Sequence, residues 1–330
     1  MGSQVRWGAA LIILLLVSIG ADLYAQRPLP PQETAPPIRV EVELVNVAFS
    51  VMDKRHRFVG GLGPDDFQVF EDGVPQEIKF FDADTNMPLR IGVVIDTSNS
   101  VRPRFQFEQE AAIDFLFTVI RPDRDLGFVM GFDASAFLVQ DFTSDAQDLA
   151  DAIRSLRAGG GTALFDAIYL ACKEMLARGE TDEIRKMLIV LSDGEDNYST
   201  VTREEAIEMA RRTGVTIFTV STNSPPTTHK DARFLQEPCK VMNARGDKVL
   251  ERVAEASGGR AFCPFNPMDV GRTFQKLAEQ LRHQYQLAYT PTNHQRDGGF
   301  RVLEIRIRRK GLRVFHRPGY LALPQTENPG

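Results

Sequence analysis

The sequence predicts an α/β fold with a doubly wound, mostly parallel sheet, joined to a smaller all-β domain built from the flanking segments. Two observations lead to this prediction. From Leu89 onward, continuous apolar strand-like runs alternate with amphipathic helical segments, as in parallel sheets that helices cover on both faces. Over 38–82 and 285–323, apolar residues recur at every second position, which is typical of strands with one buried face.

Composition places the chain among ordinary globular proteins. The 330 residues are 43% hydrophobic and 25% charged, which excludes disorder throughout. The 39 basic and 44 acidic residues give a formal net charge of −5. This balance provides no broad attraction to nucleic acid or anionic lipid, so we expect no nucleic-acid partner.

Residues 1–25 have the features of a secretory signal peptide. They contain a single basic residue, Arg6, an apolar run over Gly8–Ala21, and a small residue before the expected cleavage point at Ala25–Gln26. The apolar run has about 14 residues, fewer than the roughly 20 that span a bilayer, so we expect no stable membrane span in the mature chain. The protein is therefore expected to be secreted, or to lie in the periplasm or cell envelope.

A proline-rich linker and a small β unit follow the signal. Residues 26–37 are rich in proline, which favours a stiff extended chain without a core of its own. In the β unit, 38–82, the pair Asp72–Gly73 favours a tight hairpin turn between two alternating segments.

The central domain is expected over 83–284. Strands are predicted at 90–96, 126–132, 135–141, 186–192, 215–221 and 260–263, and helices at 103–120, 145–156, 164–178, 202–213, 247–257 and 267–283. Capping boxes are predicted at Ser144–Gln147 and Thr202–Glu205, and an N-cap followed by proline at Asn266–Pro267.

The alternating pattern returns near the C-terminus. Residues 285–289 and 303–307, separated by a turn rich in polar residues, are predicted to form a β-hairpin within the unit 285–323. Neither this unit nor 38–82 is long enough to bury a core alone, so we expect the two to pair as one sandwich-like domain. Residues 324–330 are expected to be a tail.

Three polar segments follow apolar strands or precede a helix in the central domain. The first is Asp96-Thr97-Ser98-Asn99-Ser100, the second contains Thr162 after three glycines, and the third contains Asp193. Strand ends of parallel sheets meet at one edge, so these side chains are expected to converge. All of them offer oxygen, which suits Mg²⁺ and also Mn²⁺ or Ca²⁺, whereas zinc prefers sulfur or nitrogen.

The pattern Asp96-x-Ser98-x-Ser100, with Thr162 and Asp193, resembles the metal-ion-dependent adhesion site of von Willebrand factor A domains. The resemblance implies that these five residues hold the metal directly or through water, and that an acidic residue of a partner protein completes its coordination. With its flanking β units, the chain resembles the von Willebrand factor A-related proteins of the acidobacterial type.

The resemblance favours a non-catalytic adhesion module that binds an acidic residue of a partner protein. One alternative is an envelope protein in which the metal only braces the loops, and a second is a metal-assisted hydrolase. The chain has neither a G-x-S-x-G sequence nor a G-x-x-x-x-G-K-[ST] loop, which argues against two common classes of enzyme. A third interpretation is that these Asp, Ser and Gly residues are ordinary turn and capping residues.

The chain has three cysteines. Export would permit a disulfide, and Cys239 and Cys263 flank a loop-like segment that such a bond could close. Two unpaired thiols are the alternative. Cys172 lies in an apolar helical pattern and is expected to be a buried free thiol.

Overall fold

The computed structural model describes residues 44–54, 57–83, 88–178, 184–223, 245–264, 271–275, 277–278 and 284–322. The predicted signal peptide, linker and C-terminal tail lie outside these ranges, as does the predicted helix start at Asn266–Pro267. Within them, no helix is both long and apolar enough to cross a bilayer.

The described part of the central domain is built on a six-stranded sheet in the order β10-β9-β8-β5-β6-β7. The strands are β5 (Leu89–Asp96), β6 (Leu126–Phe132), β7 (Ala136–Thr143), β8 (Arg185–Ser192), β9 (Thr216–Ser221) and β10 (Ala261–Phe262). Neighbouring strands are parallel except β6 and β7, which are antiparallel. The predicted mostly parallel sheet is confirmed.

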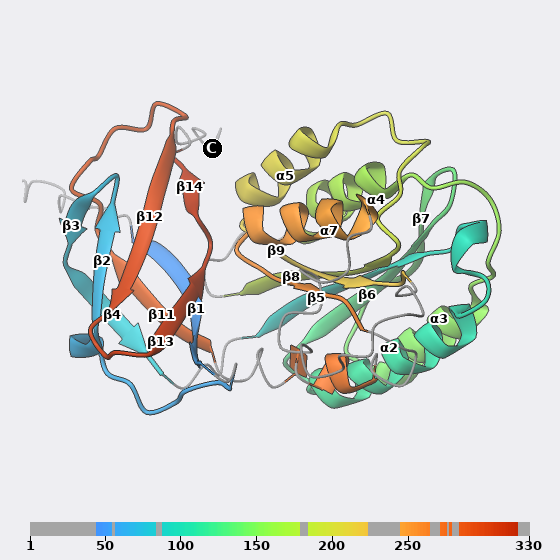
Figure 1. Cartoon of the computed structure of the whole chain (residues 1–330), viewed down its shortest axis with the longest axis horizontal. Helices are drawn as coiled ribbons and strands as arrows, with labels where there is room; N and C mark the ends of the chain where they lie inside the picture. The colour runs from blue at the N-terminus through green and yellow to red at the C-terminus, as the bar shows by residue number, and fades with distance from the viewer. Residues whose placement is uncertain are drawn as a thin grey trace, which may run out of the picture. The chain divides into compact units, whose positions relative to one another are not determined.

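Helices cover both faces of this sheet (Figure 1). The helices are α2 (Phe105–Val119) and α3 (Ala146–Ser155) on one face, and α4 (Leu164–Leu170), α5 (Arg203–Arg212) and α7 (Arg245–Ala256) on the other. Helix α4 continues as a π-helical turn over Ala171–Leu176, and a short 3-10 turn, Asn99–Val101, follows β5. Two apolar layers on one sheet confirm the doubly wound architecture.

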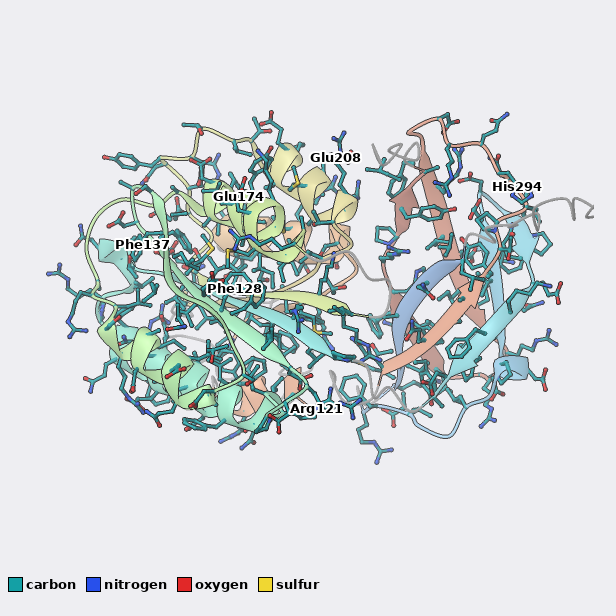
Figure 2. The ribbon with its side chains drawn as sticks, turned by 180° about the vertical axis from the view of Figure 1, so that it is seen from behind. Arg121, Phe128, Phe137, Glu174, Glu208 and His294 are labelled. Atoms are coloured by element: carbon teal, nitrogen blue, oxygen red, sulfur yellow. The ribbon has the colours of Figure 1, made fainter. Side chains whose placement is uncertain are left out.

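Alternate residues of β5 face the two layers. Val93 and Ile95 pack with α2 and α3, whereas Val94 packs with α4. Phe128 and Phe137, labelled in Figure 2, differ in burial because they lie on different strands. Phe128 is fully buried on the inner strand β6, whereas Phe137 is 40% exposed on the edge strand β7.

The helix starts were predicted with mixed success. The capping box of α5 is confirmed, because Thr202 and Glu205 bond each other's backbone N–H groups. The capping box predicted at Ser144–Gln147 is wrong. The N-cap of α3 is Asp145, whose Oδ1 accepts a hydrogen bond from the Gln147 backbone N–H at 2.7 Å, while Ser144 precedes the cap.

The flanking segments form two four-stranded sheets, in the orders β13-β1-β11-β4 and β14-β12-β2-β3. The strands are β1 (Val45–Asp53), β2 (Phe67–Glu71), β3 (Val74–Gln76), β4 (Ile78–Asp82), β11 (Gln284–Tyr289), β12 (Phe300–Ile307), β13 (Leu312–His316) and β14 (Gly319–Leu321), and a 3-10 turn covers Pro64–Asp66. One apolar core contains residues of both sheets, among them Phe49, Phe67, Tyr285 and Ile305. The two sheets therefore pack as a sandwich.

The β-hairpin predicted within 285–323 is wrong. Strand β11 pairs with β1 and β4, whereas β12 pairs with β2 and β14 in the other sheet. Alternation predicts which face of a strand is buried, but it does not identify the neighbouring strand. The turn at Asp72–Gly73 is confirmed, with φ of 48° and 80°, as a two-residue hairpin with positive φ requires.

Candidate metal centre

The candidate site lies at the carboxyl edge of the central sheet. Strand β5 ends at Asp96 and its parallel neighbour β8 ends at Ser192, directly before Asp193. Both strands are central, and their apolar residues are buried between the helical layers. The sheet thus fixes the starting point of both polar loops.

Asp96 is fully buried, and neighbouring groups hold both of its carboxylate oxygens. Oδ1 accepts a hydrogen bond from the Ser98 backbone N–H at 2.8 Å, and Oδ2 accepts one from the Ser192 hydroxyl at 2.7 Å. Ser192 also accepts a hydrogen bond from the Gly194 N–H at 3.0 Å. Ser192 therefore couples the ends of β5 and β8.

The two serines of the first loop lie side by side. Their hydroxyl oxygens, Ser98 Oγ and Ser100 Oγ, are 2.9 Å apart. Ser98 is buried and Ser100 is exposed, so the pair leads from Asp96 toward the surface. Thr97 attaches the same loop to the end of β6, because its N–H and its hydroxyl both donate to the Phe132 carbonyl.

The glycine-rich loop is attached to the first loop by hydrogen bonds. The Asn99 side chain donates to the Gly160 carbonyl at 3.2 Å, and the Gly159 N–H donates to the Thr97 carbonyl. These bonds bring the loop that carries Thr162 next to the serine loop.

Thr162 itself is buried and fixed by the loop that follows β8. Its N–H donates to Asn197 Oδ1 at 3.0 Å, and its carbonyl accepts from the N–H groups of Asn197 and Tyr198. A side chain at Gly161 would overlap the ring of Tyr198, which is itself 58% exposed. Glycine at this position therefore allows an aromatic ring to lie beside the candidate site.

Asp193 is 7% exposed and has its own hydrogen bonds. Its Oδ1 accepts from the Glu195 N–H at 3.0 Å, and its carbonyl accepts from the Asn223 side chain at 2.8 Å. Asn223 also donates to Asp247 of α7, which ties the Asp193 loop to the neighbouring strand and helix.

The electrostatics of the site favour a cation. Burial raises the pKa of Asp96 to about 6, and the negative charge of Asp193 acts in the same direction, against hydrogen bonds from Ser192 and Ser98. Glu108 of α2 is also buried, and burial raises its pKa to about 8; Asp96 and Asp193 add to this rise, and Arg104 opposes it. Burial and the charge of Asp193 thus disfavour the ionised form of Asp96, and burial with the charges of both aspartates disfavours the ionised form of Glu108.

The donor set fits a hard divalent cation. The five predicted ligands are two carboxylates and three hydroxyls, and oxygen ligands of this kind suit Mg²⁺, Mn²⁺ and Ca²⁺. In the described ranges, no group of three or more His, Cys, Asp or Glu side chains is arranged to hold a metal. A cation at these loops would therefore need hydroxyl ligands in addition to carboxylates.

Sequence reasoning missed two residues of this site. Ser192 was visible as the last residue of a buried strand beside Asp193, but its bond to Asp96 depends on strand order. Glu108 had a clear signal, because it occupies a core position in the spacing Phe105, Glu108, Ala112, Phe115 and Val119, where an acidic residue is unusual.

Two of the three cysteines, Cys172 and Cys263, lie within the described residues. Cys172 is a buried free thiol, as expected, and Cys263 is disulfide-bonded. Cys239, the partner that the sequence predicts, lies outside the described residues.

Comparison with known proteins gives several similarities. A UPF0353 protein of Mycolicibacterium gilvum (strain PYR-GCK) is 28% identical over 208 residues, which cover 58% of this chain and 60% of that protein. The chain thus spans less than two thirds of that relative. Among solved structures, BatB from Bacteroides thetaiotaomicron is 18% identical with a TM-score of 0.45, covering 58% of this chain and 98% of that chain.

A second solved structure is proximal thread matrix protein 1 from the mussel byssus, with a zinc-occupied MIDAS motif. It is 18% identical with a TM-score of 0.48, covering 64% of this chain and 49% of that chain.

The family model for the von Willebrand factor type A domain matches residues 91–259, from β5 through α7. Strands β6 to β9, helices α2 to α7 on both faces and the polar loops at the ends of β5 and β8 lie within this match, whereas β10 follows it. The chain therefore belongs to the von Willebrand factor type A domain family.

Proposed function

We propose that Asp96, Ser98, Ser100, Thr162 and Asp193 hold a divalent cation that binds an acidic side chain of a partner protein. Mg²⁺ is the preferred ion, with Mn²⁺ and Ca²⁺ as alternatives. The observation that carries the proposal is the fully buried Asp96 carboxylate, which lies beside the paired hydroxyls of Ser98 and Ser100 and within electrostatic range of Asp193.

Charge balance supports an acidic partner. Only Asp96 and Asp193 of the five proposed ligands carry charge, and the hydroxyls contribute none. When bound, the cation supplies a positive centre that attracts the carboxylate of a partner Asp or Glu. The exposed side chains of Ser100 and Asn99 and the exposed ring of Tyr198 border the side from which a partner approaches.

The same geometry favours binding over catalysis. The hydroxyls of Ser98 and Ser100 bond each other, and that of Ser192 bonds Asp96, so among the described residues none of them is paired with a histidine base. The histidines in the described ranges, His294 and His316, both belong to the β-sandwich segments. We therefore propose a binding module and not a hydrolase.

Two measurements test the proposal. Calorimetry with Mg²⁺ should detect binding to the purified chain and none to Asp96→Asn, whereas Asp114→Asn, an equivalent change at an exposed position of α2, should bind as wild type. Capture of a partner from envelope extract should need Mg²⁺ and fail in EDTA. Cation binding without cation-dependent capture would favour the alternative in which the metal only braces the loops.

The proposal also covers export of the protein and the division of the chain into domains. We propose that residues 1–25 direct export to the periplasm, cell envelope or medium, that 26–37 is a linker, and that 38–82 and 285–323 form one domain around 83–284. The N-terminal sequence of the mature protein tests the export signal, because cleavage is expected at Ala25–Gln26.

A further inference from the structure

Glu108 is a buried carboxyl group in the first turn of α2, the helix that follows the serine loop. It is 3% exposed, and its helical neighbours on the same face, Phe105 and Ala112, belong to the apolar core. Its Oε2 has no hydrogen-bond partner among the described residues. Burying a carboxylate without a partner is costly, so this position calls for a specific explanation.

A salt bridge with Arg104 does not provide that explanation. The Arg104 Nε and Glu108 Oε1 atoms are 3.9 Å apart, beyond hydrogen-bond distance, and Oε2 lies outside the contact. The other charged groups that act on Glu108 are Asp96 and Asp193, and both repel its negative charge. The surroundings therefore disfavour a third negative charge unless a positive charge is added.

Direct coordination of a cation by all three acidic groups is also excluded by the arrangement. Asp96, Glu108 and Asp193 are not arranged to hold a metal ion together, since no described group of three such side chains is. Glu108 is within electrostatic range of Asp96 and Asp193, and it is not one of the five proposed ligands. Carboxylates in such outer positions orient ligands and bound water in metal sites.

We propose that Glu108 is a positioning residue of the cation site, whose Oε2 accepts a hydrogen bond from a water molecule on the cation. This inference rests on the function proposed above. Glu108 adds negative charge near the ion without occupying the coordination position that a partner needs. The water also provides a hydrogen-bond donor for the buried Oε2 atom of Glu108.

The experiment is a substitution series in the full chain, with Mg²⁺ alone as the probe. Calorimetry is expected to give 10- to 100-fold weaker binding for Glu108→Gln, in the range typical of outer-shell carboxylates. Glu108→Met, which removes both the charge and the acceptor, should bind more weakly than Glu108→Gln. Glu110→Gln, the same change at an exposed position two residues along α2, should leave the affinity unchanged.

A second readout separates this role from a structural one. In EDTA, the urea midpoint of Glu108→Gln should equal or exceed that of wild type, because the substitution removes a buried acidic group. Equal Mg²⁺ affinity in Glu108→Gln and wild type would overturn the inference and leave the proposed function standing. Loss of the folded state in both Glu108 variants would also overturn it, since Glu108 would then be a structural residue.

Failure of the wild-type chain to bind Mg²⁺, Mn²⁺ or Ca²⁺ would overturn the proposed function and this inference together.

Discussion

Asp96→Asn is expected to make the metal-free protein more stable at neutral pH while abolishing its binding of divalent cations. Asp96 is fully buried, and burial raises its pKa from 3.8 to about 6. Asparagine has nearly the same shape and cannot ionise. The substitution therefore removes the free-energy cost of a buried charge.

The expected size follows from the pKa shift. A shift of roughly two units, at about 1.4 kcal/mol per unit, corresponds to about 3 kcal/mol. Because the folded state holds the proton more tightly than the unfolded chain, the free energy of unfolding of the wild type falls as the pH rises from 3.8 to about 6. It stays at the lower value above that pH.

The hydrogen bonds of Asp96 reduce this gain. An asparagine can still accept the Ser98 N–H, but its amide nitrogen cannot accept the Ser192 hydroxyl, and this loss costs about 1 kcal/mol. We therefore expect a net stabilisation of about 2 kcal/mol at neutral pH. Below pH 3.8 the variant should be slightly less stable than wild type, because both side chains are then neutral.

Urea denaturation in EDTA across this pH range measures the effect, with Asp114→Asn as the control. Adding Mg²⁺ at about 100 times its dissociation constant should then stabilise the wild type by about 2.7 kcal/mol and leave Asp96→Asn unchanged. A variant that is less stable than wild type by the same amount at every pH would refute the reasoning. It would show that the hydrogen bonds of Asp96 outweigh the cost of its charge.

Four further outcomes are expected. Ser192→Ala should weaken Mg²⁺ binding about fivefold by calorimetry, since one hydrogen bond of about 1 kcal/mol orients the carboxylate at the end of β5. Unchanged binding would remove Ser192 from the site. Thr202→Ala should lower the free energy of unfolding by about 1 kcal/mol in urea, because it removes the capping box of α5. Cys172 should resist alkylation in the folded protein, since burial raises its pKa to about 12, and non-reducing peptide mapping should link Cys239 to Cys263.

The central domain was predictable because its strands are long and apolar. Strand β6 runs over Leu126–Phe132, as the sequence predicts, and β5 begins one residue before its predicted start. Both strands are buried on two faces, so most positions select apolar residues and the apolar run is nearly continuous. The motif residues at strand ends were equally visible, because a parallel sheet brings such ends together.

The flanking domain was harder to predict because its strands pair across long stretches of sequence. The apolar residues of β12, such as Leu303 and Ile305, were recognised, but β12 pairs with β2, more than two hundred residues earlier in the chain. A hairpin between neighbours is the simplest interpretation of two alternating segments. The bond from Tyr289 to Glu71 joins the two sheets and has no signal in either local pattern.

The candidate site also contains residues that only the structure reveals. Ser192 bonds Asp96 across 96 positions of sequence, so strand order had to be known before the contact could be inferred. Glu108 lies at a core position of α2, where an acidic residue is unusual, but the sequence alone does not link it to the site. Glu108 is linked to the site by the electrostatic effect of Asp96 and Asp193, which lie on other elements.

Three buried acidic side chains lie close together at the site, and their burial needs an explanation. Asp96, Glu108 and Asp193 come from β5, α2 and the end of β8, and each is at least nine-tenths buried. Burial and neighbouring negative charges disfavour the ionised forms of Asp96 and Glu108 in the metal-free fold, and Arg104 approaches Glu108 only to 3.9 Å. Apolar or amide side chains of similar size would remove this cost, so stability alone does not account for the arrangement. The proposed divalent cation would account for it, because a single positive centre would act on all three groups at once, and folding and cation binding would then stabilise each other.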